Sequence, residues 1–140
     1  MKTRKIGSEV FIRLEKGEDI ISCLLEIIKL YEIKLGQVSG IGACSEVTIG
    51  NFDLNEKKYN KQIKSGSFEI TNLTGNINEM AGKPYLHVHI TIADEHMKCW
   101  GGHLNSGIVS ATCELIINVF DGEVDRFRDP ESGLNFWKLD

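Results

Sequence analysis

The sequence lacks the motifs that would assign a function directly. It contains no Walker-type phosphate loop, no Rossmann glycine fingerprint after a strand and no Gly-x-Ser-x-Gly nucleophile motif. These absences argue against the common nucleotide-binding and hydrolase classes. No apolar run of the signal-peptide type follows the charged N-terminus. The longest apolar stretch, near residues 20–30, contains Ser22, Glu26 and Lys29, and it is too short and too polar to span a membrane.

Cysteine is sparse, and its spacing suggests neither a disulfide framework nor a zinc site. The four cysteines, Cys23, Cys44, Cys99 and Cys113, form no Cys-x-x-Cys motif and have apolar neighbours. Thiols in such surroundings are usually buried, and disulfides are rare in reducing compartments. We therefore interpret all four as reduced core residues, and we expect a cytoplasmic protein.

Positive charge is also in short supply. The chain carries 16 Lys and Arg residues against 20 Asp and Glu residues, which gives a formal net charge of −4. A DNA-binding domain is usually basic, because its affinity comes largely from neutralising phosphates. Two local basic groups remain, one within residues 2–5 and one within residues 57–64, and we interpret both as solvated faces. DNA is therefore a weakly supported partner.

What the sequence does have is the composition of an ordinary globular domain. Its 140 residues include 41% hydrophobic and 26% charged residues, and no Pro/Gly/Ser-rich linker or internal repeat divides them. A chain of this length buries roughly two thirds of the surface that its unfolded form exposes. We therefore expect one domain over residues 1–140 that needs neither a disulfide nor a structural metal.

Apolar periodicity predicts one long helix among many short strands. Apolar residues over 18–33 recur at helical spacing, with Glu18 and Asp19 in the first turn. Elsewhere the pattern has period two. The expected strands cover residues 10–14, 37–41, 46–52, 58–64, 67–77, 85–93, 98–103, 110–120, 123–127 and 135–139. Because helices and strands do not alternate, we predict an α+β domain in which a mainly antiparallel sheet packs against the one long helix.

The densest chemistry in the sequence is a group of histidines. Within the strand over 85–93, His87 and His89 point to the same face, and the intervening apolar residues point to the core. A three-residue loop centred on Glu95 would place His103 opposite His87, and Gly101 opposite His89. Opposed β-carbons lie about 5 Å apart. Three imidazoles at this spacing are close enough to share one metal ion.

Two interpretations of these histidines remain open. Three neutral imidazoles suit zinc, nickel, copper or ferrous iron, and we expect zinc. Three protein ligands also leave a coordination position for water or substrate, so metal-dependent chemistry on a small molecule is an alternative function. In the other interpretation His87 and His89 are surface or hydrogen-bonded strand residues. His96, on the predicted turn, is expected to be a solvated loop residue.

Two acidic residues occur inside apolar strands. Glu69 and Glu114 are each candidates for a fourth ligand, for a carboxylate that supports a ligand from behind, for a general base or for a partner contact. Both could equally face solvent, and this is the interpretation that we favour.

The sequence resembles the plants and prokaryotes conserved (PPC) domain over nearly its whole length. The resemblance rests on residues 13–19 (RLEKGED), 38–43 (VSGIGA), 67–70 (SFEI), 83–89 (KPYLHVH), 101–104 (GGHL) and 129–134 (DPESGL). Each piece is weak alone, but their order and spacing together are specific.

This resemblance implies an antiparallel sheet packed with a helix, assembled as a homotrimer. Stand-alone prokaryotic members are usually labelled DNA-binding proteins. In plants an AT-hook segment precedes the domain and binds DNA, and the present sequence has no such segment. A plant motif for partner contacts, Gly-Arg-Phe-Glu-Ile-Leu, is replaced here by Gly-Ser-Phe-Glu-Ile-Thr at residues 66–71. A metal site of the family would map to His87, His89 and His103.

Overall fold

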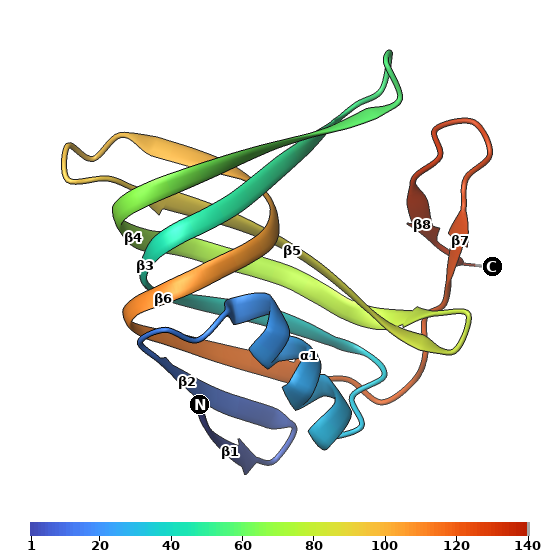
Figure 1. The fold of residues 1–140 in the computed structure, drawn as a ribbon. Coiled ribbons are helices and arrows are strands. Elements are labelled where there is room, and N and C mark those ends of the chain that lie inside the picture. Colours follow the sequence, from blue (N-terminus) through green and yellow to red (C-terminus); the bar gives the residue numbers. More distant parts are fainter. Residues whose placement is uncertain (140) are drawn as a thin grey trace.

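One curled antiparallel sheet makes up most of the protein; the structure, a computed structural model, describes residues 1–139 (Figure 1). Its strands lie in the order β1-β2-β6-β3-β4-β5, and β5 pairs with β6 as well as with β4. The last strand of the order, β5, therefore also pairs with the inner strand β6, and this second pairing curls the sheet. The strands are β1 (Lys2–Ile6), β2 (Glu9–Glu15), β3 (Gly36–Asp53), β4 (Lys58–Met80), β5 (Lys83–Ala93) and β6 (Cys99–Val119).

The predicted long helix is a short one, α1, which spans Ile20–Leu30. Asp19 is its N-cap rather than a first-turn residue, because the Asp19 side chain accepts a 2.9 Å hydrogen bond from the Ser22 N–H. At the other end Tyr31 is the C-cap, and Glu32 takes a left-handed φ of 52° that cannot continue the helix. The mainly antiparallel α+β fold is confirmed, but the length of the helix was wrong. None of the described helical residues forms a segment long and apolar enough to cross a membrane.

Several strands that the sequence suggested as separate are continuous. The predicted strands at 37–41 and 46–52 are both part of β3, and the expected bend between them consists of two register shifts, at Gly40/Gly42 and Cys44/Glu46. A β-bulge bends a strand without ending it. In the same way β4 unites 58–64 with 67–77, and β6 unites 98–103 with 110–120. Strand β1, on which Lys2 and Arg4 lie, was not predicted as a strand.

The sheet carries α1 on one face and leaves the other face open near β2. Alternation along β2 buries Val10, Ile12 and Leu14 in the same core cluster as the buried residues of α1. On the opposite face Phe11 pairs with Ile116 across β2 and β6, and both side chains are exposed. Three of the four cysteines are buried, as predicted. The predicted core position of Cys99 was wrong: Cys99 is exposed, because it opens β6 directly beside a loop.

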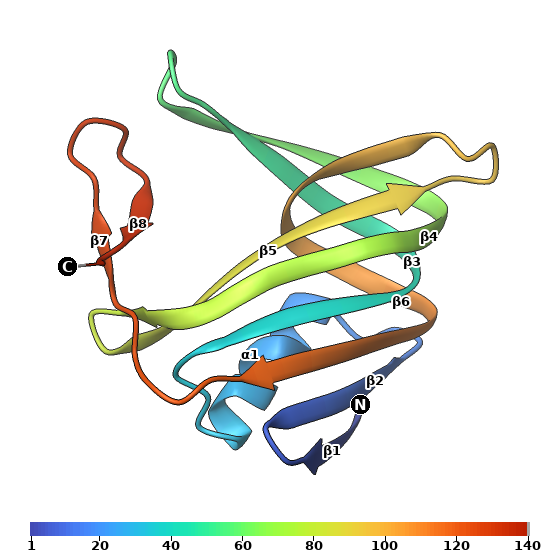
Figure 2. The same cartoon turned by 180° about the vertical axis from the view of Figure 1, so that it is seen from behind.

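A small hairpin follows the main sheet. It consists of β7 (Arg126–Arg128) and β8 (Asn135–Trp137), which is shorter than the predicted strands at 123–127 and 135–139. Both ribbon views show this hairpin beside the end of the sheet where β4 turns into β5 (Figures 1 and 2). Hydrogen bonds from Arg126 to Asn76 and Asn78 join it to β4. The hairpin thus forms a wall next to the strand that carries two of the candidate histidines.

Candidate metal centre

Two of the three candidate histidines share one face of β5. The alternation of this strand buries Val88, Ile90 and Ile92 in the core. His87 and His89 stand on the opposite face, where His87 is half-buried and His89 is exposed. The orientation that the sequence predicted for this strand is therefore confirmed.

The third histidine reaches the same face through the hairpin between β5 and β6. The predicted pairing of His87 with His103 is wrong, because His89 lies opposite His103 and Thr91 lies opposite Gly101. The ladder ends at the pair Ala93–Cys99, so the loop comprises residues 94–98 rather than 94–96. Both loops contain an odd number of residues. The register therefore shifts by two positions, and the side chain of His103 stays on the predicted face.

Asp94 holds the longer loop together. Its Oδ1 accepts hydrogen bonds from the backbone N–H groups of His96 and Lys98, each at 2.9 Å. The Asp94 N–H donates to the Lys98 carbonyl at 3.0 Å, and Met97 has a left-handed φ of 61°. An aspartate that caps the backbone of its own loop is a common turn device. The sequence contained this signal, but it was assigned to a shorter turn.

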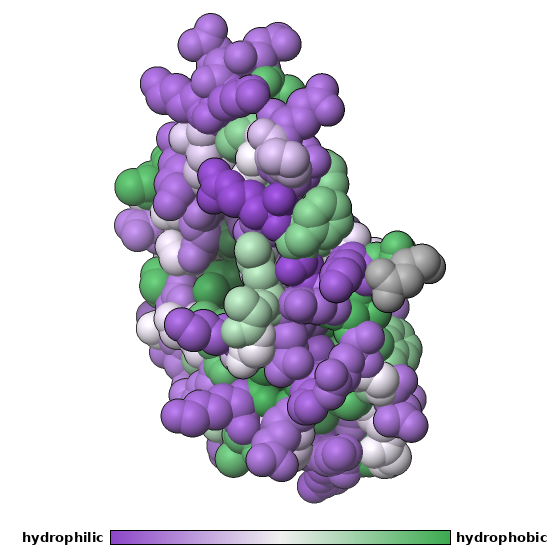
Figure 3. All heavy atoms as spheres, turned by 90° about the vertical axis from the view of Figure 1, so that its right-hand side faces the viewer, coloured by the Kyte–Doolittle hydropathy of each residue, from purple (hydrophilic) through white to green (hydrophobic). Residues whose placement is uncertain are grey.

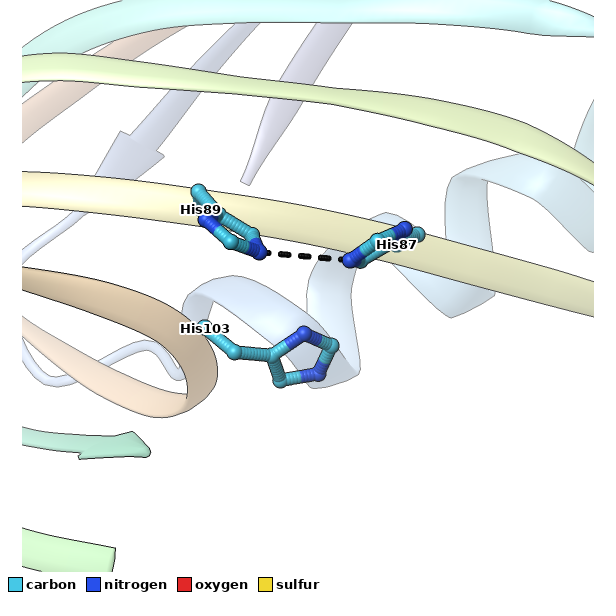
Figure 4. A group of neighbouring side chains, drawn as sticks. All are labelled: His87, His89 and His103. Atoms are coloured by element: carbon cyan, nitrogen blue, oxygen red, sulfur yellow. Dashed lines mark hydrogen bonds between the residues drawn. The ribbon is translucent and has the colours of Figure 1, made fainter. Parts of the chain in front are cut away.

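The three imidazole rings face one another (Figure 4). The ring centroid of His87 lies 5.1 Å from the centroid of His89 and 5.1 Å from that of His103. The centroids of His89 and His103 are 5.6 Å apart. The Nε2 atoms of His87 and His89 are 3.2 Å apart, and one nitrogen from each of the three rings lies within 4.8 Å of the others. A tetrahedral ion with bonds of about 2.1 Å separates its ligands by about 3.4 Å. The predicted clustering is thus confirmed.

Burial favours the neutral, metal-binding form of two of these rings, His87 and His103. It lowers the pKa of His87 to about 4, with smaller effects from His103, His89 and the positive charge of Arg126. Burial also lowers the pKa of His103, assisted by His89 and Lys61. Both rings are therefore neutral near pH 7. A neutral imidazole has a free nitrogen lone pair for coordination and releases no proton when a metal binds.

The cluster opens into a cavity of about 740 Å³. The cavity is bounded by β3, β4 and β5, by the start of β6 and by the C-terminal hairpin. Besides the three histidines, its lining includes the aromatic residues Phe52, Tyr59, Tyr85, Phe136 and Trp137. The Tyr59 ring packs edge-on against His103 with centroids 6.0 Å apart, and its hydroxyl accepts a 2.9 Å hydrogen bond from Asn105. On this side of the molecule the β3–β4 tip is mainly hydrophilic, and hydrophobic side chains are scattered among hydrophilic ones below it (Figure 3).

The cavity contains two functional candidates that the sequence reasoning missed. Arg126 and Trp137 belong to the C-terminal hairpin, and both line the same cavity as the histidines. Only the tertiary packing of this hairpin on β4 brings them there, and no spacing along the chain encodes that approach. The available signal was weak, because Arg126 lies in a segment, residues 121–140, that is rich in charged residues of both signs.

The other candidates lie outside the histidine cluster. Glu69 is exposed and pairs with Ala93, at the end of β5 that leads into the β5–β6 loop. His89 pairs with Thr74, farther along the same ladder. Glu114 is exposed on β6, between Arg13 of β2 and Ile41 of β3. Within residues 1–139, the cluster that could hold a metal includes neither carboxylate. His96 lies in the hairpin loop and is solvated, as predicted, with its ring 3.5 Å from Glu95.

Two solved structures resemble this chain closely. A putative DNA-binding protein from Bacteroides thetaiotaomicron is 31% identical and superposes with a TM-score of 0.96, over 98% of this chain and 96% of that one. A metal-containing protein from Archaeoglobus fulgidus is 30% identical and has a TM-score of 0.88, with 96% of each chain covered.

A longer curated protein contains a similar segment. The bifunctional protein GlmU of Synechococcus sp. (strain JA-2-3B'a(2-13)) is 28% identical over 131 residues, which are 91% of this chain but 19% of that protein. The present chain therefore spans about a fifth of the length of that relative. The model of the Plants and Prokaryotes Conserved (PCC) domain, the family abbreviated PPC above, matches residues 1–121. This match and the two structural likenesses agree, and the chain belongs to the Plants and Prokaryotes Conserved domain family.

Proposed function

We propose that His87, His89 and His103 bind one divalent transition metal ion, and that zinc is this ion. The observation that carries the proposal is the convergence of three ring nitrogens within 4.8 Å on one face of the β5–β6 hairpin. The lowered pKa values of His87 and His103 add support, because protons compete only weakly for these rings near pH 7. The Archaeoglobus relative described above is named as a metal-containing protein.

A second function follows from the open side of this centre. Three protein ligands leave a fourth position on zinc, where the ion can polarise a substrate oxygen or lower the pKa of a bound water. In this protein that position would face a cavity of about 740 Å³ with aromatic walls. The alternative proposal is therefore a metal-dependent enzyme that acts on a small molecule.

The module is proposed to act as a homotrimer. Support comes from the face of the sheet that α1 does not cover. There Phe11, Ile41 and Ile116 are 41%, 60% and 37% exposed, and cross-strand pairing places Phe11 beside Ile116. Glu114 lies on the same face, opposite Ile41, which is the position expected of a partner contact. Exposed apolar patches of this kind commonly mark subunit interfaces.

DNA binding is retained as a weaker candidate. Its support is the name of the Bacteroides relative and a group of lysines near the β3–β4 turn, namely Lys57, Lys58, Lys61 and Lys64. Two of these lysines already lie against aromatic rings, Lys61 over Tyr59 and Lys64 over Trp100. The net charge of −4 opposes a broad phosphate interface.

The metal proposal predicts about one ion per chain. Protein that is purified, loaded with zinc and desalted should retain the ion, and elemental mass spectrometry measures it. The triple variant His87→Ala/His89→Ala/His103→Ala should retain none, because all three ligands are gone. His96→Ala is the matched control, since it removes an exposed loop histidine and should leave the metal content unchanged. Equal metal content in the triple variant and the wild type would disprove the site.

The enzyme alternative predicts chelator-sensitive turnover. Zinc-loaded protein should hydrolyse at least one member of a panel of small esters, amides and nucleotides. The triple histidine variant should be inactive on the same compound. Turnover that survives both the chelator and the triple variant would come from another source. If folded, metal-loaded protein hydrolyses none of these compounds, the enzyme alternative fails and the metal-binding proposal is unaffected.

The trimer proposal predicts that a charge on the open face separates the subunits. Ile116→Glu should shift the mass measured by sedimentation equilibrium from three chains toward one, because an isolated carboxylate is costly to bury in an apolar interface. Leu54→Glu is the control, since Leu54 is 62% exposed at the tip of the β3–β4 turn. A wild-type protein that sediments as a monomer would refute the assembly.

The DNA candidate predicts a characteristic salt response. Fluorescence anisotropy with a labelled duplex should show weak binding that falls steeply as salt increases, because phosphate contacts release counterions. Lys57→Glu/Lys58→Glu should weaken it further. If the wild type does not bind the duplex even at low salt, the DNA function is excluded.

A further inference from the structure

One charged side chain lies deep in the structure without a carboxylate partner. Arg126 is 7% exposed, and within residues 1–139 it is the buried residue that carries a charge. None of the ion pairs among these residues involves Arg126. Buried charges are normally paired, because an isolated ion loses much of its hydration energy. The position of Arg126 therefore calls for an explanation.

Neutral groups hold the guanidinium of Arg126 in place. Its Nε donates to Asn78 Oδ1 at 3.0 Å, one terminal nitrogen donates to the Asn135 carbonyl at 2.7 Å, and the other donates to Asn76 Oδ1 at 2.8 Å. A guanidinium has five N–H groups. Within the described chain, one N–H on each terminal nitrogen is thus left without a protein acceptor. None of the three acceptors carries a negative charge.

The surroundings of Arg126 keep its plane fixed. Its guanidinium carbon lies 4.5 Å from the centre of the Tyr85 ring and 5.8 Å from that of Trp137. The side chain of Asn78 turns its oxygen toward Arg126, although its Nδ2 then has no partner within the described chain. These contacts orient the guanidinium but do not balance its charge. Burial accordingly lowers the pKa of Arg126, opposed by Tyr85.

Arg126 and the histidine cluster share one cavity. Arg126, His87, His89 and His103 all line the space of about 740 Å³, and the charge of Arg126 is close enough to help lower the pKa of His87. The cavity therefore has a fixed positive group on one wall and, on another, three histidines that could bind a metal. Aromatic rings line the same cavity. Arginine with two free N–H groups matches the planar oxygens of a carboxylate or the oxygens of a phosphoryl group.

We propose that this cavity binds a small organic acid whose oxyanion pairs with Arg126 while a second oxygen donor occupies the open position of the metal centre. The ion pair with Arg126 stands on the buried guanidinium alone. The contact with the metal rests on the proposed function of the three histidines. A ligand of this class supplies the negative charge that the described chain does not place beside Arg126, and its carbon skeleton packs between Tyr85 and Trp137.

The test is a binding titration with three probes of similar length. Succinate carries two carboxylates, 3-phosphonopropionate replaces one of them by a phosphonate, and succinamide is uncharged. Calorimetry and quenching of the tryptophan fluorescence report binding, since Trp137 lies beside Arg126. Zinc-loaded and chelated proteins are compared at an ionic strength matched with sodium chloride. Both acids should bind and succinamide should not. The acid that binds more tightly identifies the preferred oxyanion.

Variants at Arg126 separate recognition from structure. Arg126→Gln should weaken succinate binding by about 10- to 100-fold, the usual loss for a charge-assisted hydrogen bond. Arg126→Lys keeps the charge but not the planar guanidinium, so its affinity for succinate should fall between those of the wild type and Arg126→Gln. Arg128→Gln is the matched control, because Arg128 is exposed on the same strand. Its affinity for succinate should equal that of the wild type.

The outcomes distinguish this proposal from the metal function. In one outcome the chelated protein binds succinate and this binding depends on Arg126, but the protein retains no zinc after loading. The anion site then stands and the metal site fails. If zinc-loaded protein binds succinate equally well with Arg126→Gln, the anion site is overturned and the metal site stands. Should Arg126→Gln not fold, the wild type still decides, since equal binding of succinate and succinamide would overturn the proposal.

Discussion

The candidate site depends on the parity of one cross-strand ladder, in which His89 lies opposite His103. Side chains alternate along a strand, so only one parity of the β5–β6 hairpin puts all three imidazoles on the face away from the core. The apolar residues between the histidines fix that parity from behind, because Val88 and Ile90 must remain buried. The position of the rings is therefore a by-product of core packing, and the loop needs only to close with an odd number of residues.

The environment of the rings follows from the curl of the sheet. Because β5 pairs with both β4 and β6, the strands around the histidines form a concave surface rather than a flat one. Tyr59 of β4 packs against His103 from one side, and the C-terminal hairpin forms another wall. This partial enclosure withdraws water from His87 and His103 and so favours their neutral state. The same geometry places a buried cation within reach of the rings.

Much of this arrangement could be predicted from the sequence, and the failures have specific causes. The shared face of His87 and His89 follows from alternation alone, and the partner strand of His103 follows from turn residues. The pairing was wrong by two residues because Asp94 caps a longer loop with its own side chain. The division of β3, β4 and β6 into shorter strands arose because bulges and glycines resemble breaks in a period-two pattern. Arg126 was missed because its role depends entirely on tertiary packing.

The hydrogen bonds between Arg126 and β4 tie the cavity to a part of the chain beyond the match to the family model. The match of this chain to the family model ends at residue 121, whereas the hairpin that carries Arg126 and Trp137 begins after it. A polypeptide cut at that boundary would retain every histidine and most of the sheet. It would lose one side of the recess in front of them, together with the nearby cation. A comparison restricted to residues 1–121 therefore omits the part of the chain that carries Arg126 and Trp137, the residues that would give this cavity its selectivity.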